Sequence, residues 1–351
     1  MKIAIDISPL STGHSVRGVG FYLKHLKDSL EKYHPEHTYI LFKEIKEIPH
    51  SVDLIHYPFF DPFFINYPLI KTKPTVVTVH DLIPLKFPEY FPVGIKGRLK
   101  WELNKGLLRT MDRIITDSSC SKEDIVDIVS YPQEKVDVIH LAAGEDFKKV
   151  QLTKETRLEM KEKYNFPDKF ALYVGDVTWN KNLPNLVRAS KEASIPLVMV
   201  GKALTQTEYD RNHPWNADLV AVQKLIEGDA NFLPLGFVED LDLLTLYNMA
   251  TVFVFPSLYE GFGLPILEAM ACGTPVVTTK EGSLNEIAGE AAYFVDAQGI
   301  ESLTHGLKTV FHSEKLQEEL SIKGLQRVHE FSWRKTASET IKIYESVVSS
   351  Q

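Results

Sequence analysis

The sequence predicts two Rossmann-like α/β domains that face each other across a ligand-binding cleft. Its 351 residues are too many for one ordinary hydrophobic core. Apolar runs of strand length alternate with helical patterns, which is typical of parallel strands joined by crossover helices. The alternation starts again after a polar stretch at 140–155. We therefore place the domains at 1–150 and 151–330, with a terminal helix at 331–351.

The first domain is predicted to contain six strands. The strand-like runs lie at residues 2–7, 38–42, 52–57, 75–80, 113–118 and 135–140. Helical patterns between them include residues 21–33, 97–111 and 121–130. The last of these begins with Ser121-x-x-Asp124, which resembles a capping box and predicts a helix start at that point.

The second domain repeats the pattern. Its strand-like runs are at residues 170–175, 196–201, 231–236, 251–256 and 274–279. Several of these runs end in glycine or a small polar residue before a helix. In open α/β sheets, ligands bind at these carboxyl ends, where the strand order reverses. The apolar periodicity of residues 331–348 predicts one more amphipathic helix.

Composition excludes several classes of protein. The net charge of −8 lies entirely in residues 151–351, which carry 19 basic and 27 acidic side chains. No basic stripe of the kind that nucleic-acid binding requires is present. Two cysteines, Cys120 and Cys272, cannot form a disulfide framework. No apolar run is long enough to span a membrane, and MKIAIDISPL does not resemble a signal peptide. These features predict a soluble cytoplasmic protein.

The segment PSLYEGFGLPILEAMACGTPVV places Glu260 just before a predicted helix and Glu268 within that helix. Glycines before a helix let its unpaired N–H groups approach an anion or a sugar hydroxyl closely. A carboxylate can accept two hydrogen bonds from the vicinal diol of a ribose. Ordinary loop and helix carboxylates are the alternative, and the glycine-rich surroundings favour a binding site.

This segment resembles the E-x7-E motif of the retaining GT-B glycosyltransferases of family 4, also called glycosyltransferase group 1. The resemblance extends over almost the whole chain. VTVHDLIPLKFP, YVGDVTWNKN and FSWRKTA are most similar to the bacterial mannosyltransferase-like branch. It implies a GT-B fold, in which the terminal helix from Ser332 crosses back onto the first domain.

By this resemblance, Glu268 binds the ribose hydroxyls of a sugar nucleotide and Glu260 faces the donor sugar. The backbone N–H groups around Phe262, Gly263 and Leu264 contact the sugar or the phosphate. The backbone of Val238, after the strand that ends at Gly236, is a candidate contact for the nucleobase.

Lys181 follows Gly175 by six residues, where the family keeps a lysine that neutralises the donor diphosphate. Asp176 and Asn180 stand where many members carry an arginine, so one or both of the usual positive charges are missing. Lys202 is a candidate to compensate for them. The alternative for Lys181 is a solvated loop lysine.

His80 closes a strand-like run, and a family histidine in this loop reaches the donor sugar. A structural histidine is the alternative. Asp81 is expected to cap the following turn. The loop 13–20 lacks the G-x-G-x-x-G spacing, so as a dinucleotide fingerprint it is weak. The resemblance places Gly18 and Gly20 over the donor phosphate, with Arg17 as an anion contact; a turn that needs glycines for backbone reasons is equally compatible.

The resemblance thus implies a retaining transferase that moves a hexose, with mannose favoured, from a nucleotide-diphosphate sugar to a glycan or lipid-linked acceptor. GDP-mannose is the favoured donor, and polysaccharide biosynthesis is the expected process. No metal-ligand spacing is visible, so we expect catalysis without a metal or a cofactor. A non-catalytic sugar-nucleotide or glycan-binding protein is the alternative. The basic stretch at 96–113 favours a solvated surface over a peripheral contact with the inner face of the membrane.

Overall fold

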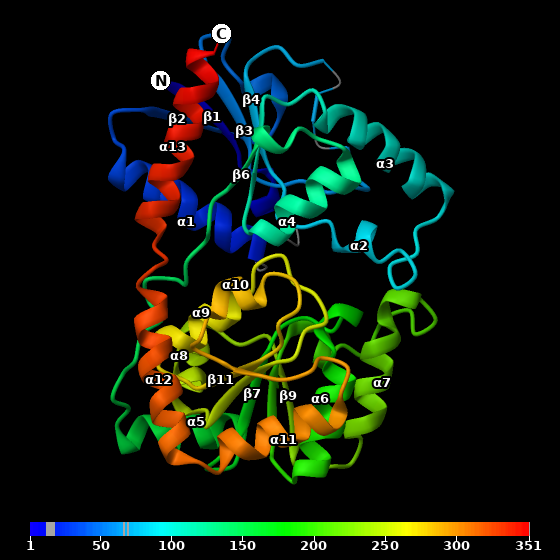
Figure 1. Cartoon of the computed structure of the whole chain (residues 1–351), viewed down its shortest axis with the longest axis vertical. Helices are drawn as coiled ribbons and strands as arrows, with labels where there is room; N and C mark the ends of the chain where they lie inside the picture. The colour runs from blue at the N-terminus through cyan, green and yellow to red at the C-terminus, as the bar shows by residue number, and fades with distance from the viewer. Residues whose placement is uncertain (12–17, 66, 69, 351) are drawn as a thin grey trace. The chain divides into compact units, whose positions relative to one another are not determined.

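A computed structural model describes residues 1–11, 18–65, 67–68 and 70–350 (Figure 1). The chain divides into two compact units. One combines Met1–Ala142 with the chain from Phe331 onward, and the other is Ala143–Glu330. Each unit is built on a six-stranded parallel sheet, which confirms the predicted pair of Rossmann-like domains. Nearly all residues of the central strands are buried, as expected for parallel strands that helices cover on both faces.

The first unit forms its sheet in the order β2 (Thr38–Phe42), β1 (Lys2–Asp6), β3 (Leu54–Tyr57), β4 (Thr75–Thr78), β5 (Arg113–Thr116) and β6 (Val136–Val138). Its chain begins at β1, adds β2 on one side and then adds β3 on the other. Its helices are α1 (Gly18–Tyr33), α2 (Ile83–Lys86), α3 (Ile95–Leu108), α4 (Ser119–Asp124) and α13 (Trp333–Ser349).

The second unit has the sheet order β12 (Tyr293–Phe294), β11 (Val276–Thr278), β10 (Val252–Phe255), β7 (Ala171–Val174), β8 (Leu197–Val200) and β9 (Phe232–Gly236). Its helices are α5 (Lys154–Tyr164), α6 (Leu183–Ala193), α7 (Ala217–Ile226), α8 (Asp240–Met249), α9 (Leu264–Ala271), α10 (Leu284–Ala288), α11 (Ile300–Phe311) and α12 (Glu314–Val328).

The strand order of the second unit reverses between β7 and β10. The chain begins at β7, adds β8 and β9 on one side and then adds β10 on the other side of β7. In such sheets the crevice outside the carboxyl ends of the two strands at the reversal is the usual ligand site. The loops that follow β7 and β10 are therefore the first place to look for chemistry.

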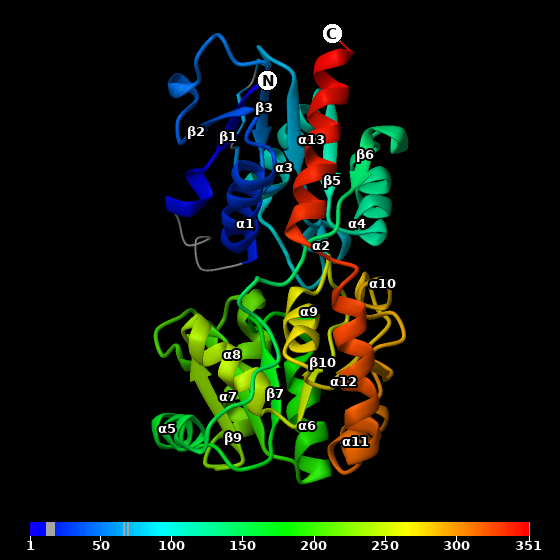
Figure 2. The same ribbon diagram turned by 90° about the vertical axis from the view of Figure 1, so that its left-hand side faces the viewer.

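The terminal helix α13 packs on the first unit, beside α1, as the resemblance implied (Figure 2). Its N-cap Ser332 accepts a hydrogen bond from the N–H of Lys335. Near its other end, the hydroxyl of Tyr344 lies 2.6 Å from Nδ1 of His56. Nε2 of His56 lies 2.9 Å from the hydroxyl of Thr78 on β4. Burial lowers the pKa of His56 to about 3, so this polar core is uncharged at neutral pH.

Two details differ from the sequence prediction. The helix expected to start at Ser121 starts two residues earlier, because the hydroxyl of Ser118 caps it by accepting from the N–H of Ser121. The short edge strand β12 was missed, since two residues carry no usable periodicity.

Candidate functional site

Lys181 and Glu260 form an ion pair at the strand-order reversal of the second unit. Lys181 ends the 3-10 turn Trp179–Lys181 after β7, and Glu260 lies in the loop after β10. Nζ of Lys181 is 2.7 Å from Oε1 and 2.9 Å from Oε2 of Glu260. Only 19% of the lysine side chain and 8% of the glutamate side chain are exposed, so water screens the pair weakly. The lysine is therefore not the solvated loop residue of the alternative interpretation.

The backbone around Glu260 is held from the side of α10. Gly282 has φ of +60°, and a Cβ on it would lie 2.6 Å from the carbonyl oxygen of Glu260. The hydroxyl of Ser283 donates to the carbonyls of Glu260 (3.1 Å) and Phe262 (2.8 Å). The close approach requires glycine at 282, and the serine fixes the loop.

Asn180, which stands at one of the two positions where the resemblance implied an arginine, braces the same loop. Its side chain is buried, donates to the carbonyl of Tyr259 (3.1 Å) and accepts from the hydroxyl of Thr178 (2.7 Å). An amide at this position thus supplies structure and no charge. Lys202 is exposed and opens the 3-10 turn after β8, the strand next to β7.

Glu268 is buried on α9 and is 8% exposed. The hydroxyl of Tyr247, on α8, donates to its Oε2 over 2.9 Å. Burial raises the pKa of Glu268 to about 7 despite this hydrogen bond, which favours the ionised form. The carboxyl group is therefore poised to gain or lose its proton near neutrality.

Helix α9 begins at Leu264, so Glu260 lies before it and Glu268 within it as predicted, and it carries Pro265 in its first turn. Gly263 is its N-cap with φ of +105°, a conformation that favours glycine. A Cβ there would also lie 2.9 Å from Cδ2 of Leu284. Phe262, Gly263 and Leu264 thus stand at a helix N-terminus, where N–H groups favour an anion or hydroxyl.

Gly175 follows β7 and Val238 follows β9, the two strands that lie on either side of β8. A Cβ on Gly175 would be 2.8 Å from the hydroxyl of Tyr173, so packing alone requires glycine there. Val238 is buried two residues after Gly236, which has φ of +68°. Their roles towards a donor stay predictions.

His80 follows β4 in the first unit, and Asp117 follows β5, the neighbouring strand. Nδ1 of His80 lies 2.7 Å from Oδ2 of Asp117, whose side chain is 4% exposed. Burial alone would lower the pKa of His80, but the Asp117 carboxylate outweighs it and the pKa is raised. Asp81 accepts from the N–H of Ile83, as its predicted capping role requires.

Gly18 and Gly20 lie in the first turn of α1. A Cβ on Gly18 would have nothing within 4 Å, so its packing does not require glycine. Arg17 and the rest of the predicted phosphate-facing loop, residues 13–16, lie outside the described residues.

Two family models match the chain, "Glycosyl transferases group 1" over residues 156–327 and "Glycosyltransferase Family 4" over residues 12–143. The O-antigen chain mannosyltransferase B of Escherichia coli is 30% identical over 288 residues, which cover 78% of this chain and 71% of that protein. The chain belongs to the group 1 glycosyltransferase family. The resemblance drawn from its motifs is confirmed.

This glycosyltransferase is also similar to the serotype-specific mannosyltransferase WbdA of Escherichia coli, at 30% identity over 274 residues. They cover 75% of the chain but 32% of WbdA, so the chain spans about a third of that relative. Among solved structures, the sucrose-phosphate synthase of Thermosynechococcus elongatus has a TM-score of 0.74 at 19% identity, with both chains fully covered. The predicted GT-B fold is thereby confirmed.

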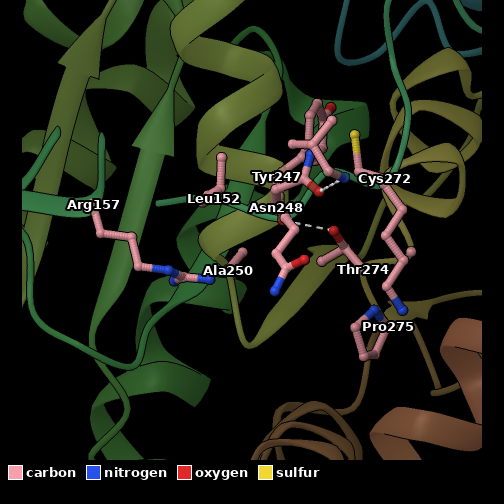
Figure 3. Close-up of a pocket in the computed structure, with 12 residues that line it drawn as sticks. Leu152, Arg157, Tyr247, Asn248, Ala250, Cys272, Thr274 and Pro275 are labelled. Carbon is pink, nitrogen blue, oxygen red and sulfur yellow. Dashed lines mark hydrogen bonds between the residues drawn. The ribbon is translucent and has the colours of Figure 1, made fainter. Parts of the chain in front are cut away.

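The second unit also contains a pocket of about 580 Å³ whose lining does not include Lys181, Glu260 or Glu268 (Figure 3). Its lining includes Ala250, Thr274 and Pro275, which precede β10 and β11, so it lies at the amino ends of these strands. Glu260 follows β10 at the opposite edge of the sheet. Tyr247 also lines the pocket; its carbonyl accepts from the hydroxyl of Thr274, and its hydroxyl donates to Glu268.

Among the residues that the structure describes, no group of three or more His, Cys, Asp or Glu could hold a metal ion. In the same part of the chain, no helix is long and apolar enough to cross a membrane. The positive groups at the carboxyl edge of the second sheet include Lys181 and Lys202.

Sequence reasoning missed several residues of the glycosyltransferase that hold the predicted ones. Asp117 orients His80, Tyr247 contacts Glu268, and Gly282 with Ser283 fixes the Glu260 loop. Asp117 had a usable signal, because it ends a strand-like run as His80 does and adjacent parallel strands align such ends. Tyr247, Gly282 and Ser283 lie in helices or loops, and only the tertiary fold shows which residues they contact.

Proposed function

We propose that this glycosyltransferase moves a hexose, with mannose favoured, from a nucleotide-diphosphate sugar to a glycan or lipid-linked saccharide, with retention of anomeric configuration and without a metal. The observation that carries the proposal is the Lys181–Glu260 ion pair at the strand-order reversal, beside the helix that bears Glu268. A buried cation held at this point is suited to a departing diphosphate.

The nucleotide would lie on the second unit. Glu268, once ionised, can accept hydrogen bonds from both ribose hydroxyls. The N-terminus of α9 and its glycine N-cap offer N–H groups to the sugar or the phosphates. The backbone after Gly236, at Val238, would meet the base. Gly18 and Gly20, at the start of α1, would lie over the donor phosphates, and His80 would reach the sugar.

In the transfer step, an acceptor hydroxyl attacks the anomeric carbon from the face that the diphosphate leaves. The carbon–oxygen bond to the diphosphate breaks as the new glycosidic bond forms, and the acceptor proton passes to an oxygen of the departing phosphate. Lys181 and the N–H groups of α9 stabilise the growing negative charge because they are oriented beforehand. Glu260, held by its loop, would face the donor sugar.

The relatives support mannose as the sugar, since two of them carry mannosyltransferase names. GDP-mannose is therefore the favoured donor, and an O-antigen-like polysaccharide or its lipid-linked precursor is the favoured class of acceptor, bound on the first unit. The chain has two cysteines, Cys120 and Cys272, and such sparse use of cysteine fits a reducing cytoplasm.

Donor hydrolysis tests this proposal most directly. The protein is incubated with GDP-mannose, UDP-glucose or UDP-N-acetylglucosamine, with and without EDTA, and the released nucleotide is measured. We expect slow release of GDP from GDP-mannose that EDTA does not suppress and that Lys181→Ala slows by roughly 10²–10³. Release from another donor would correct the sugar, and loss of release in EDTA would overturn the metal-free mechanism.

A non-catalytic sugar-nucleotide or glycan-binding protein is the second candidate. The buried, uncharged Asn180 favours it, because by the resemblance one or both of the positive charges usual at this site are missing. Calorimetric binding of a nucleotide sugar together with no release from any donor, with and without added saccharide acceptors, would establish it.

A further inference from the structure

The outer side of α3 carries an apolar ridge. Ile95, Leu99 and Leu103 follow one another at a spacing of four residues and are 79%, 67% and 43% exposed. Residues four apart lie on the same side of a helix. The opposite side of α3 is buried through Asn104 and Leu108. The helix thus presents apolar side chains both to its own core and to the outside.

A neighbouring loop widens this apolar surface. The side chain of Asn104 donates to the carbonyls of Asp61 (3.2 Å), Pro62 (3.0 Å) and Phe64 (2.9 Å), which fastens the loop to the helix. Phe64 and Ile65 are 60% and 45% exposed. Phe64, Ile65, Ile95, Leu99 and Leu103 together form what we call the α3 face.

Basic side chains flank the ridge on both sides. At 100° per residue, Lys96 and Lys100 lie to one side of Leu99, whereas Arg98 and Lys105 lie to the other. Nζ of Lys100 also lies 4.9 Å from the ring centre of Phe64. Against these four cations, α3 contains a single acidic residue, Glu102. Apolar side chains and three of these cations, Lys96, Arg98 and Lys100, are therefore exposed on this helix, while Lys105 is half-buried.

We propose that the α3 face docks on an anionic lipid bilayer. A ridge of large apolar side chains between two rows of cations suits the boundary between acyl chains and acidic headgroups. The long stems of lysine and arginine let the ridge enter that boundary while their charges stay at the headgroups. The helix has 14 residues, which is too short to span the bilayer but long enough to lie in its surface.

This inference is independent of the donor site, since it needs no residue that touches the donor. It replaces the solvated surface that the basic residues alone favoured, because a solvated face has no reason to expose Ile95 and Leu99 to this extent. For an enzyme with a lipid-linked acceptor, docking would concentrate the protein where that acceptor lies.

Vesicle flotation with the full chain tests the inference. We expect binding to vesicles of phosphatidylcholine containing about 30% phosphatidylglycerol and little binding to phosphatidylcholine alone. Leu99→Asp should weaken the partition coefficient by about tenfold or more. Lys96→Glu with Lys100→Glu should weaken it at least as much. Because Leu99 is largely exposed, the variant should keep its melting temperature.

Matched controls lie on the second unit. Leu158→Asp changes a leucine that is 60% exposed, and Lys154→Glu with Lys224→Glu changes the charge by the same amount on exposed lysines. These variants should float like the unchanged protein. Equal losses in the controls, or no flotation of the unchanged protein, would overturn the inference.

Two other results would assign the α3 face to a different occupant. Flotation that salt abolishes but Leu99→Asp leaves intact would indicate simple attraction to an acidic surface, as of an acidic protein. A dimer in solution without vesicles that Leu99→Asp dissociates would make the face an interface between copies of the chain. Hydrolysis of a nucleotide sugar should be unchanged in Leu99→Asp, so failure here is distinguishable from failure of the proposed function.

Discussion

Replacing Glu268 with glutamine should change how stability depends on pH. Burial raises the pKa of this carboxyl from 4.5 to about 7, so the folded state binds a proton that the unfolded state has already lost. The resulting stabilisation is fully present below pH 4.5 and is lost as the pH rises through about 7. A shift of this size corresponds to about 3 kcal/mol, at about 1.4 kcal/mol per pKa unit.

Urea unfolding at a series of pH values between 4.5 and 9 measures this effect. From pH 4.5 to pH 9, the unfolding free energy of Glu268→Gln should rise by about 3 kcal/mol relative to that of the unchanged protein, because the amide does not titrate. Glu281→Gln, at an exposed glutamate of the same unit, should run parallel to the unchanged protein. Parallel curves for Glu268→Gln as well would refute the claim that a buried, titrating carboxyl lies here.

The same substitution tests the ribose assignment. Two hydrogen bonds from a ribose diol favour the ionised carboxylate, so donor binding should release protons below pH 7, which calorimetry in buffers of different ionisation enthalpy detects. Glu268→Gln should abolish this release and raise the donor Kd about tenfold or more at pH 8, since a hydrogen bond to a charged group is worth roughly 1.5–3 kcal/mol. An unchanged Kd would show that Glu268 does not bind the ribose.

Three further substitutions test the rest of the site. Lys181→Ala should lower kcat for donor hydrolysis by roughly 10²–10³ while changing the donor Kd much less, and equal losses in both would place the lysine in ground-state binding. Asp117→Asn should lower the pKa of His80, measured by NMR titration; an unchanged pKa would mean that the carboxylate does not hold the imidazolium. Gly282→Ala should cost about 1–3 kcal/mol in unfolding free energy and reduce hydrolysis. Gly228 also has a positive φ, but a Cβ added there would have nothing within 4 Å. If Gly228→Ala costs as much unfolding free energy as Gly282→Ala, the contact of residue 282 with the Glu260 loop is unimportant.

The fold was predictable because each level of the sequence agrees with it. Apolar runs such as 75–80 and 251–256 are buried strands, and Gly263 and Gly273 flank the helix that carries Glu268, with Pro265 in its first turn. The predicted helix start at Ser121 was wrong because the actual start depends on one hydrogen bond to a side chain. Ser118 and Ser121 both suit an N-cap, and only the backbone geometry decides between them.

The site was predictable where a residue follows a strand. Lys181, Glu260 and His80 all follow carboxyl ends of parallel strands, and the order of those strands places the first two together. The partners that set their chemistry could not be predicted in the same way. The effect of Tyr247 on Glu268 depends on how α8 packs against α9, and no residue spacing in the sequence predicts that packing.

The Lys181–Glu260 ion pair bears on how the net charge of the chain affects donor binding. All of the net −8 belongs to residues 151–351, the part that would hold an anionic donor. Glu260 also pairs with Lys181, so the nearest buried cation is already balanced before any donor arrives. Long-range attraction therefore contributes little to donor binding at this edge. The groups left to stabilise the donor are the oriented N–H groups of α9, the exposed Lys202 and the fixed Lys181. Such groups act best on the negative charge that grows as the diphosphate departs.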